Sequence, residues 1–378
     1  MKRLFLFLIN LALFLTLTKD LSPVYAITDP LSVANNKVGV HLLFPGELEM
    51  AEKLVNHEVG DWGYVTVPIQ AGDRDRVKWQ HFFDQCLDLH LIPLIRVATF
   101  AQGPHWEQPN NYDLIDFANF LSDLSWPTQN RYVIIFNEVN RADEFGGWVS
   151  PEKYADILIN AIDIFKKHSE DFFLLPAGLD NAAITTTNSV YWQTYLRQMY
   201  HQQPEVFNRL DGWTSHAYPN PAFSASPYLS GSNRINSFIF DLSYLKNFTS
   251  KKLPVFITET GWSNQNLSPS TISSYYDYAF THIWSHSQVV AVTPFLLRAS
   301  TPPFNQFSLL DTSDQPTPVY LTLQKYTSSG QPLLTSTSQS NPQTLGLSFQ
   351  STPVLSQIDT TPLRRFYFFI KSVFNRYD

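Results

Sequence analysis

The stretch "RYVIIFNE" (131–138) and the stretch "SPEKYADILINAIDIFKKH" (150–168) that follows it decide the fold class. The first is a short run of mostly apolar residues at consecutive positions, which is typical of a parallel strand covered on both faces. The second begins with Ser150 in an N-cap position and Pro151 at the first helical position. Its apolar residues then recur at helical spacing along one face. Together the two stretches predict one strand–helix unit.

The same alternation repeats along residues 37–326, and a second helix with a Ser-Pro start is expected at 268–287. Eight such units match a (β/α)8 TIM barrel better than an open doubly wound sheet, which usually has fewer strands. We therefore expect an α/β protein with a single catalytic domain of this fold. The expected strands are 37–44, 62–69, 92–99, 131–138, 172–178, 210–218, 253–260 and 289–297.

The N-terminal segment 1–26 has the pattern of a secretory signal peptide. Lys2 and Arg3 precede an apolar run over 4–17, and Ala26 ends a cleavage-like "VYA". An uncleaved N-terminal anchor is the alternative, although the apolar run is short for a membrane span. In both cases the protein is expected to be exported, either secreted or held at the cell surface.

The composition changes after the predicted barrel domain, which we place at 27–326. Residues 327–362 are rich in Ser, Thr, Gln and Pro with almost no charge, which predicts a flexible linker. Residues 363–378, "LRRFYFFIKSVFNRYD", combine basic and aromatic residues. This last segment has the composition of one that contacts an anionic membrane surface, and a short helix packed against the barrel is the alternative.

Charge and composition limit the class of ligand. The net charge of −7 argues against nucleic acid as a partner. Aromatic residues make up 15% of the chain and charged residues 16%, a balance suited to a neutral oligo- or polysaccharide held against ring faces. The one cysteine, Cys86, excludes an internal disulfide. No pattern of metal ligands is present, so we expect neither metal nor cofactor, and we expect a monomer.

Two glutamates end apolar runs and are the candidate catalytic residues, because the C-terminal ends of the strands form the active face of such a barrel. Glu138 ends the fourth run in "IIFNEVN", and Glu259 ends the seventh in "VFITETGW". They lie 121 residues apart, which places them across the barrel mouth from each other. Paired carboxylates cleave glycosidic bonds, with retention when they are about 5–5.5 Å apart and inversion when the spacing is wider.

The motifs "NEVN" and "ITETGW" resemble those of clan A, the retaining glycoside hydrolases with (β/α)8 barrels, and their wording is most similar to the β-1,3-glucanase family. The resemblance covers about 37–326. It implies that Glu138 is the acid/base and Glu259 the nucleophile. It further implies that Asn137 binds the sugar 2-hydroxyl, and that His216 and Tyr218 in "SHAYPNP" contact the nucleophile or the sugar.

Four further side chains are predicted to bind substrate. Arg96 on the third run is the nearest substitute for the arginine that many clan members carry on strand two. Trp262, three residues past Glu259, is expected to be an exposed stacking platform, and Trp148 is the next candidate. His41, in the first run, completes the set. The structural alternative for His216 is a hydrogen-bonded core histidine, and for Arg96 a counter-charge to an acidic mouth.

Strand eight offers Phe295 and Arg298 where clan members often carry a tryptophan. Together with the missing strand-two arginine, this motivates a second hypothesis, a non-catalytic surface barrel that binds glycans. The first hypothesis remains an exported glycoside hydrolase that cleaves a β-linked glycan by double displacement.

Overall fold

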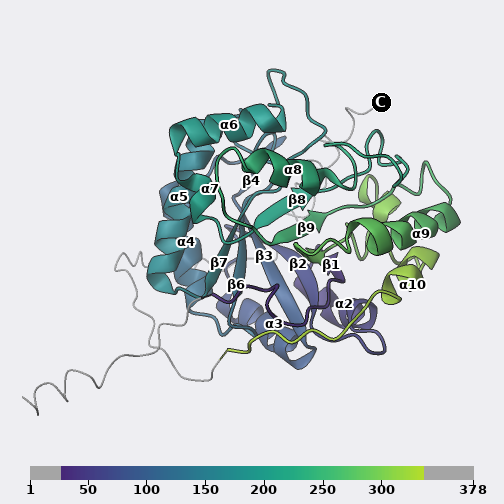
Figure 1. Cartoon of the computed structure of the whole chain (residues 1–378). Coiled ribbons are helices and arrows are strands. Elements are labelled where there is room, and N and C mark those ends of the chain that lie inside the picture. Colours follow the sequence, from purple (N-terminus) through teal and green to yellow (C-terminus); the bar gives the residue numbers. More distant parts are fainter. Residues whose placement is uncertain (1–26, 336–378) are drawn as a thin grey trace, which may run out of the picture.

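The computed structural model describes residues 27–335, which form a (β/α)8 barrel with the helices around the outside (Figure 1). Eight strands make up the barrel wall, and every pairing between neighbours is parallel. Each expected strand is present, several of them shortened at their ends. They are β1 (Gly39–His41), β2 (Gly63–Gln70), β3 (Leu91–Ala98), β6 (Arg131–Ile135), β7 (Phe172–Pro176), β8 (Trp213–His216), β9 (Val255–Glu259) and β10 (Val289–Val292).

The barrel closes through two single bridges. The order β1-β2-β3-β6-β7 forms one run and β10-β9-β8 the other. A parallel bridge from Val38 to Val292 joins β1 to β10, and one from Asp180 to His216 joins the chain after β7 to β8. The predicted fold class is thus confirmed.

Helices cover the outer face of the strands, and their starts follow the sequence signals. Ser150 caps α5 (Pro151–His168) by accepting from the Lys153 amide, as expected. Ser268 caps α9 (Pro269–Tyr278) in the same way. The expected helix at 268–287 changes at Ala279 to a π-helical turn, η2 (Ala279–Ile283). The other helices are α2 (Leu48–Val55), α3 (Arg76–Asp88), α4 (Asn111–Ser122), α6 (Trp192–Gln202), α7 (Val206–Arg209), α8 (Ser237–Leu245) and α10 (Pro318–Gln324), with 3-10 turns η1 (Pro45–Glu47) and η3 (Phe304–Phe307).

The inside of the barrel is filled by aromatic side chains below the level of the mouth. The ring of Tyr132 lies 4.9 Å from that of Phe173 and 5.4 Å from that of Phe256, and Tyr64 completes this interior group. Each such pair contributes about 0.5–1.5 kcal/mol beyond area burial. The filled interior supports the strand ends above it, which is where polar side chains gather.

The end of the barrel opposite the mouth is closed by two strips of chain that lie side by side. Gln331 donates its amide to the Ala34 carbonyl, and Gly330 donates to the Asp61 carbonyl just before β2. Thr28 and Asn130 exchange two hydrogen bonds just before β6. The first nine residues of the predicted linker, 327–335, therefore pack on the barrel (Figure 1). The predicted signal peptide 1–26, the rest of the linker and the segment 363–378 lie outside the described residues.

No helix within residues 27–335 has the length and apolarity needed to cross a membrane.

Candidate active site

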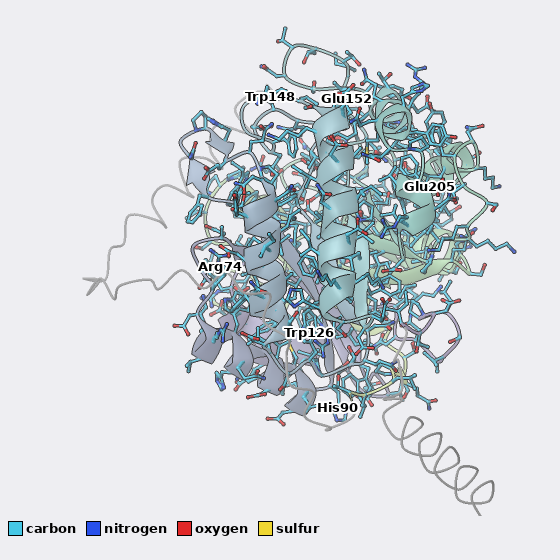
Figure 2. All side chains as sticks on the ribbon, turned by 90° about the vertical axis from the view of Figure 1, so that its left-hand side faces the viewer. Arg74, His90, Trp126, Trp148, Glu152 and Glu205 are labelled. Carbon is cyan, nitrogen blue, oxygen red and sulfur yellow. The ribbon has the colours of Figure 1, made fainter. Side chains whose placement is uncertain are left out.

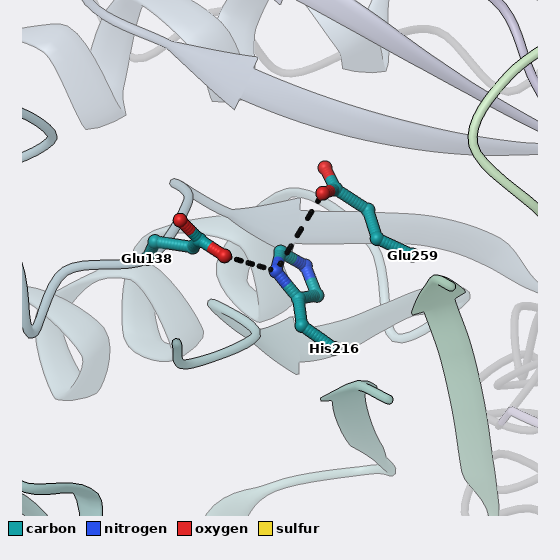
Figure 3. A group of neighbouring side chains, drawn as sticks. All are labelled: Glu138, His216 and Glu259. Atoms are coloured by element: carbon teal, nitrogen blue, oxygen red, sulfur yellow. Dashed lines mark hydrogen bonds and ion pairs between the residues drawn. The ribbon is translucent and has the colours of Figure 1, made fainter. Parts of the chain in front are cut away.

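Five barrel strands bring charged and polar side chains together at the mouth. Glu259 and His216 are the last residues of β9 and β8, and His41 is the last residue of β1. Arg96 lies in β3, and Glu138 comes three residues after the end of β6. Figure 3 shows the imidazole of His216 between the two carboxyl groups.

A strained turn places Glu138. Phe136 has φ 71° and Glu138 has φ 33°, and Asn137 lies between them. Left-handed backbone at residues other than glycine costs of order 1–3 kcal/mol each, so surrounding contacts must hold the turn. One such contact is the hydrogen bond from the Glu138 amide to the Gly178 carbonyl, 2.9 Å long. The apolar residues of β6 thus end in a turn that directs one carboxyl group into the mouth.

His216 links the two glutamates. Its Nδ1 lies 2.9 Å from Oε1 of Glu138 and 3.8 Å from Oε2 of Glu259. Gly178 makes room for this ring, because a Cβ at that position would lie 2.2 Å from Cδ2 of His216. Burial lowers the pKa of His216, but the negative charge of Glu259 and the hydrogen bond to Glu138 outweigh burial and raise it. The surroundings therefore favour the protonated form of this imidazole, which lies between the two carboxyl groups.

Glu259 is surrounded by groups that stabilise its ionised form. Nη1 of Arg96 forms an ion pair with Oε1, and the hydroxyl of Tyr218 donates to Oε2 over 3.0 Å. Burial would raise the pKa of Glu259, but the charges of His216 and Arg96 outweigh it and lower the pKa to about 2. Glu259 is therefore a carboxylate at any pH in the ordinary working range.

Glu138 is shifted in the opposite direction. Burial raises its pKa, and the nearby charge of Asp180 adds to this effect. The hydrogen bond and charge of His216 and the charge of Arg141, 3.8 Å away, oppose it without reversing the shift. The pKa values of the two carboxyl groups are thus shifted in opposite directions, as a pair with one acid and one carboxylate requires.

Asn137 lies beside this pair with a fixed orientation. Its Oδ1 accepts a hydrogen bond from Nη1 of Arg96 over 2.8 Å. Because a guanidinium only donates, this bond assigns the amide oxygen and leaves Nδ2 available. Within residues 27–335 Nδ2 donates to no protein group, and Asn137 lines the cavity. Its amide is placed to donate to a ligand in the mouth.

His41 is brought to Glu259 but not to the cavity. Its side chain is fully buried, with Nε2 3.8 Å from Oε1 of Glu259 and its ring packed edge-on to Phe295. Neither ring nitrogen has a hydrogen-bond partner within the described residues. Burial and the charge of Arg96 lower its pKa to about 3, so His41 is neutral. It is not among the residues that line the cavity, and its predicted contact with substrate stays a prediction.

The mouth contains a cavity of about 150 Å³ that is lined by both glutamates, Asn137, Arg96 and Tyr218. One wall is phenyl-rich and the other is charged. The phenyl wall consists of Phe223, Phe295, Phe304 and Phe307, and the charged wall of Arg141, Glu144 and Asp180.

The two predicted tryptophan platforms do not line the cavity. Trp262 has only 2% of its surface exposed, because its indole donates to the Ala225 carbonyl and packs against Tyr276 outside the barrel. The prediction that it is exposed is therefore wrong. Trp148 is 51% exposed and lies beside Glu152 at the mouth end of α5, on the rim (Figure 2). The cavity tryptophan is instead Trp106, on the hairpin of β4 (Ala101–Gln102) and β5 (His105–Trp106).

Three charged cavity residues were missed from sequence. Asp180 follows β7 by four residues, so a wider search beyond each strand end would have found it. Arg141 and Glu144 lie in the loop after Glu138, where no local pattern distinguishes a cavity side chain from a solvated one. Arg141 pairs with Asp143 and Asp180 at 2.9 and 3.0 Å, which holds this loop to the chain after β7.

Ligand atoms of Glu138, His216 and Glu259 lie within 4.8 Å of one another, which is close enough for all three to bind one metal ion. The ion pair between Arg96 and Glu259 already supplies one positive charge there. The arrangement therefore suits proton transfer between carboxyl groups.

No protein-family model matches the chain, and no curated protein matches it in sequence. Solved structures with the same fold do match. A family 39 glycoside hydrolase from Bacteroides cellulosilyticus is similar, with a TM-score of 0.54 and 16% identity over 81% of this chain and 65% of that chain. An endo-β-1,4-glucanase from Xanthomonas axonopodis pv. citri gives 0.52 and 16% over 77% and 98%. A family 128 endo-β-1,3-glucanase from Pseudomonas viridiflava gives 0.52 and 15% over 78% and 98%. These identities establish the barrel fold that the three enzymes share with this chain.

Proposed function

We propose that the protein is an exported glycoside hydrolase that cleaves a β-linked glycan with retention of configuration. The observation that carries the proposal is the carboxyl pair. One oxygen of Glu138 and one of Glu259 lie within 4.8 Å of each other, and the pKa values of the two groups are shifted in opposite directions. This separation suits a covalent intermediate, since inverting enzymes leave about 6.5–9.5 Å for a water molecule.

In the proposed reaction Glu259 attacks the anomeric carbon while Glu138 donates its proton to the leaving oxygen. A water molecule then gives a proton to Glu138 and displaces Glu259. Tyr218 and Arg96 hold the nucleophile in place through their bonds to its two oxygens. Asn137 is placed to donate to a sugar hydroxyl, which fits its proposed role at the 2-position.

The pH dependence follows from the two shifts. Because the pKa of Glu259 is lowered to about 2, the nucleophile is ionised throughout the ordinary range. Because the pKa of Glu138 is raised, the acid keeps its proton to higher pH than a solvated glutamate would. Activity should therefore persist in mild acid and fall when Glu138 loses its proton.

The test is to incubate the full chain with β-1,3- and β-1,4-glucans, mannans, xylans and galactans, together with Glu138→Gln and Glu259→Gln variants. The neighbours named as β-1,3- and β-1,4-glucanases place the β-glucans first in this panel. Proton NMR of the first product anomer distinguishes retention from inversion. Glycan binding without cleavage would support the non-catalytic alternative, and cleavage that survives Glu259→Gln would overturn the residue assignment.

Export is part of the proposal and rests on the signal-like segment 1–26. The test is to express the chain with and without this segment and to measure the fraction outside the cell. Equal retention of both inside the cell would contradict it.

A further inference from the structure

Glu144 is a cavity carboxyl group that neither the fold nor the carboxyl pair explains. It lies in the loop between β6 and α5, it is half-buried, and it lines the same cavity as the two candidate catalytic residues. Within residues 27–335 its carboxyl group makes no hydrogen bond or ion pair. The neighbouring charges are already engaged, since Arg141 pairs with Asp143 and Asp180. A partly buried polar group without a protein partner is costly unless a ligand or water satisfies it.

The loop that carries Glu144 is firmly held. The next residue, Phe145, is fully buried and packs against Tyr154 of α5. Gly146 has φ 79°, and a Cβ there would lie 2.4 Å from Cβ of Gln108, so the position requires glycine. The loop is thus pressed against the segment that follows the β4–β5 hairpin, and Glu144 has a fixed place at the mouth.

The backbone of Trp106 is bonded to the loop that carries Glu144. Its amide donates to the carbonyl of Asp143 over 2.8 Å, and its carbonyl accepts from the Gly146 amide over 2.9 Å. These two bonds bracket Glu144 in the chain and join the hairpin to the loop. Trp106 and Glu144 therefore lie on two segments that are bonded to each other, and both residues line the cavity.

We propose that Trp106 and Glu144 form the subsite for the leaving-group sugar, with the indole against a neutral pyranose ring and the carboxyl group bonded to one of its hydroxyls. This rests on the proposed function, since the leaving group must lie on the side of the acid, Glu138. Glu138 is the member of the carboxyl pair whose charge acts on Glu144. An uncharged carboxyl group both donates and accepts, and so matches a sugar hydroxyl.

The protonation of Glu144 supplies a readout specific to this contact. Burial and the charges of Asp143 and Glu138 raise its pKa to about 8, against the opposing charges of Arg141 and Arg96. A sugar that enters the subsite displaces the water that solvates the ionised form. Binding above pH 8 should therefore be accompanied by uptake of a proton, which a merely structural carboxyl group would not show.

The test is isothermal titration calorimetry of the full chain carrying Glu259→Gln, which prevents turnover. Cellopentaose, laminaripentaose, xylopentaose and mannopentaose are the probes, at pH 6 and pH 8.5 in two buffers of different ionisation enthalpy. Glu144→Ala and Trp106→Ala are each expected to weaken binding about tenfold, as the loss of one hydrogen bond or one ring contact implies. Glu144→Gln should bind normally at pH 6 and abolish proton uptake at pH 8.5.

Glu152→Gln is the matched control, since Glu152 is exposed in the first turn of α5 and does not line the cavity (Figure 2). Thermal unfolding of each variant shows whether it has folded. Unchanged affinity in Glu144→Ala and Trp106→Ala, or the absence of binding by every probe, overturns the subsite. If Glu144→Ala and Trp106→Ala weaken binding but the wild-type chain cleaves no glycan, the subsite stands and the hydrolase is overturned. If the wild-type chain cleaves glycan but Glu144→Ala binds with unchanged affinity, the hydrolase stands and the subsite is overturned.

Discussion

The two sides of the cavity shift the pKa of a glutamate carboxyl group in opposite directions. On one side the charges of His216 and Arg96 outweigh burial and lower the pKa of Glu259 to about 2, and Tyr218 donates a hydrogen bond to the same carboxylate. On the other side burial and the charge of Asp180 raise the pKa of Glu138, and burial raises the pKa of Glu144 to about 8. All three are glutamates that line the same cavity. The environment, and not the residue type, therefore sets the direction in which the pKa of each carboxyl group is shifted.

The largest expected effect comes from removing the charge on the ionised side. Glu259→Gln deletes the proposed nucleophile and should lower kcat by about 10⁴-fold or more, the scale seen when a covalent catalyst is lost. Reducing-sugar release measures this, with Glu152→Gln as the control. If the variant retains kcat, the opposite pKa shifts of Glu259 and Glu138 do not serve catalysis.

Arg96→Leu should reduce the difference between the pKa values of Glu259 and Glu138 while leaving both glutamates in place. Without the guanidinium the pKa of Glu259 rises from about 2, so the acid limb of the pH–rate profile moves to higher pH. The lost positioning should also lower kcat/KM by about 10- to 100-fold. Arg209→Leu is the matched control, because Arg209 pairs with Asp163 on α5, away from the cavity. An unmoved acid limb would contradict the role assigned to Arg96.

Glu144→Gln tests the raised pKa of Glu144 through its effect on the stability of the folded chain at different pH values. In the unfolded chain this carboxyl group ionises near its normal pKa, whereas in the folded chain it keeps its proton up to about pH 8. The wild type therefore loses stability as pH rises from the normal glutamate pKa to about 8, and the amide does not. We expect Glu144→Gln to raise Tm by roughly 2–4 °C at pH 8 and by little at pH 5. Calorimetry showing equal Tm differences at both values would reject this.

His41→Leu should have the smallest effect. The charge of His41 contributes to the lowered pKa of Glu259 only when His41 is protonated, and its own pKa is about 3. Between pH 5 and pH 8 it is a neutral, buried ring without hydrogen bonds. Leucine of similar size should keep kcat/KM within about threefold and leave Tm unchanged or slightly higher. A loss above 100-fold would show that the imidazole acts on Glu259 directly.

The sequence predicted those features that depend on strand periodicity. All eight strands were expected near their observed places, and the rule that active residues follow strand ends led to Glu138, Glu259 and His216, which the structure brings together. The rule works because parallel strands in a closed barrel end on one face. Arg96, predicted as the substitute for a strand-two arginine, also reaches the mouth, where it forms an ion pair with Glu259.

The sequence did not predict those features that depend on how loops pack. Trp262 lies only three residues past Glu259, yet the chain has already turned outward and its indole is buried between the loop after β8 and α9. Glu144 enters the cavity because Phe145 and Gly146 fix its loop against distant segments. Such contacts join residues far apart in sequence, so no local pattern indicates them.

The closure of the barrel opposite the mouth also determines how the molecule can be tethered. Thr28 is bonded to Asn130, and the amide of Thr335 donates to the carbonyl of Pro127, so both ends of the described chain lie just below the start of β6. Any segment joined before residue 27 or after residue 335 starts from that end. The cavity lies at the opposite end of the barrel, so a tether joined at either point would leave the mouth clear of the attachment.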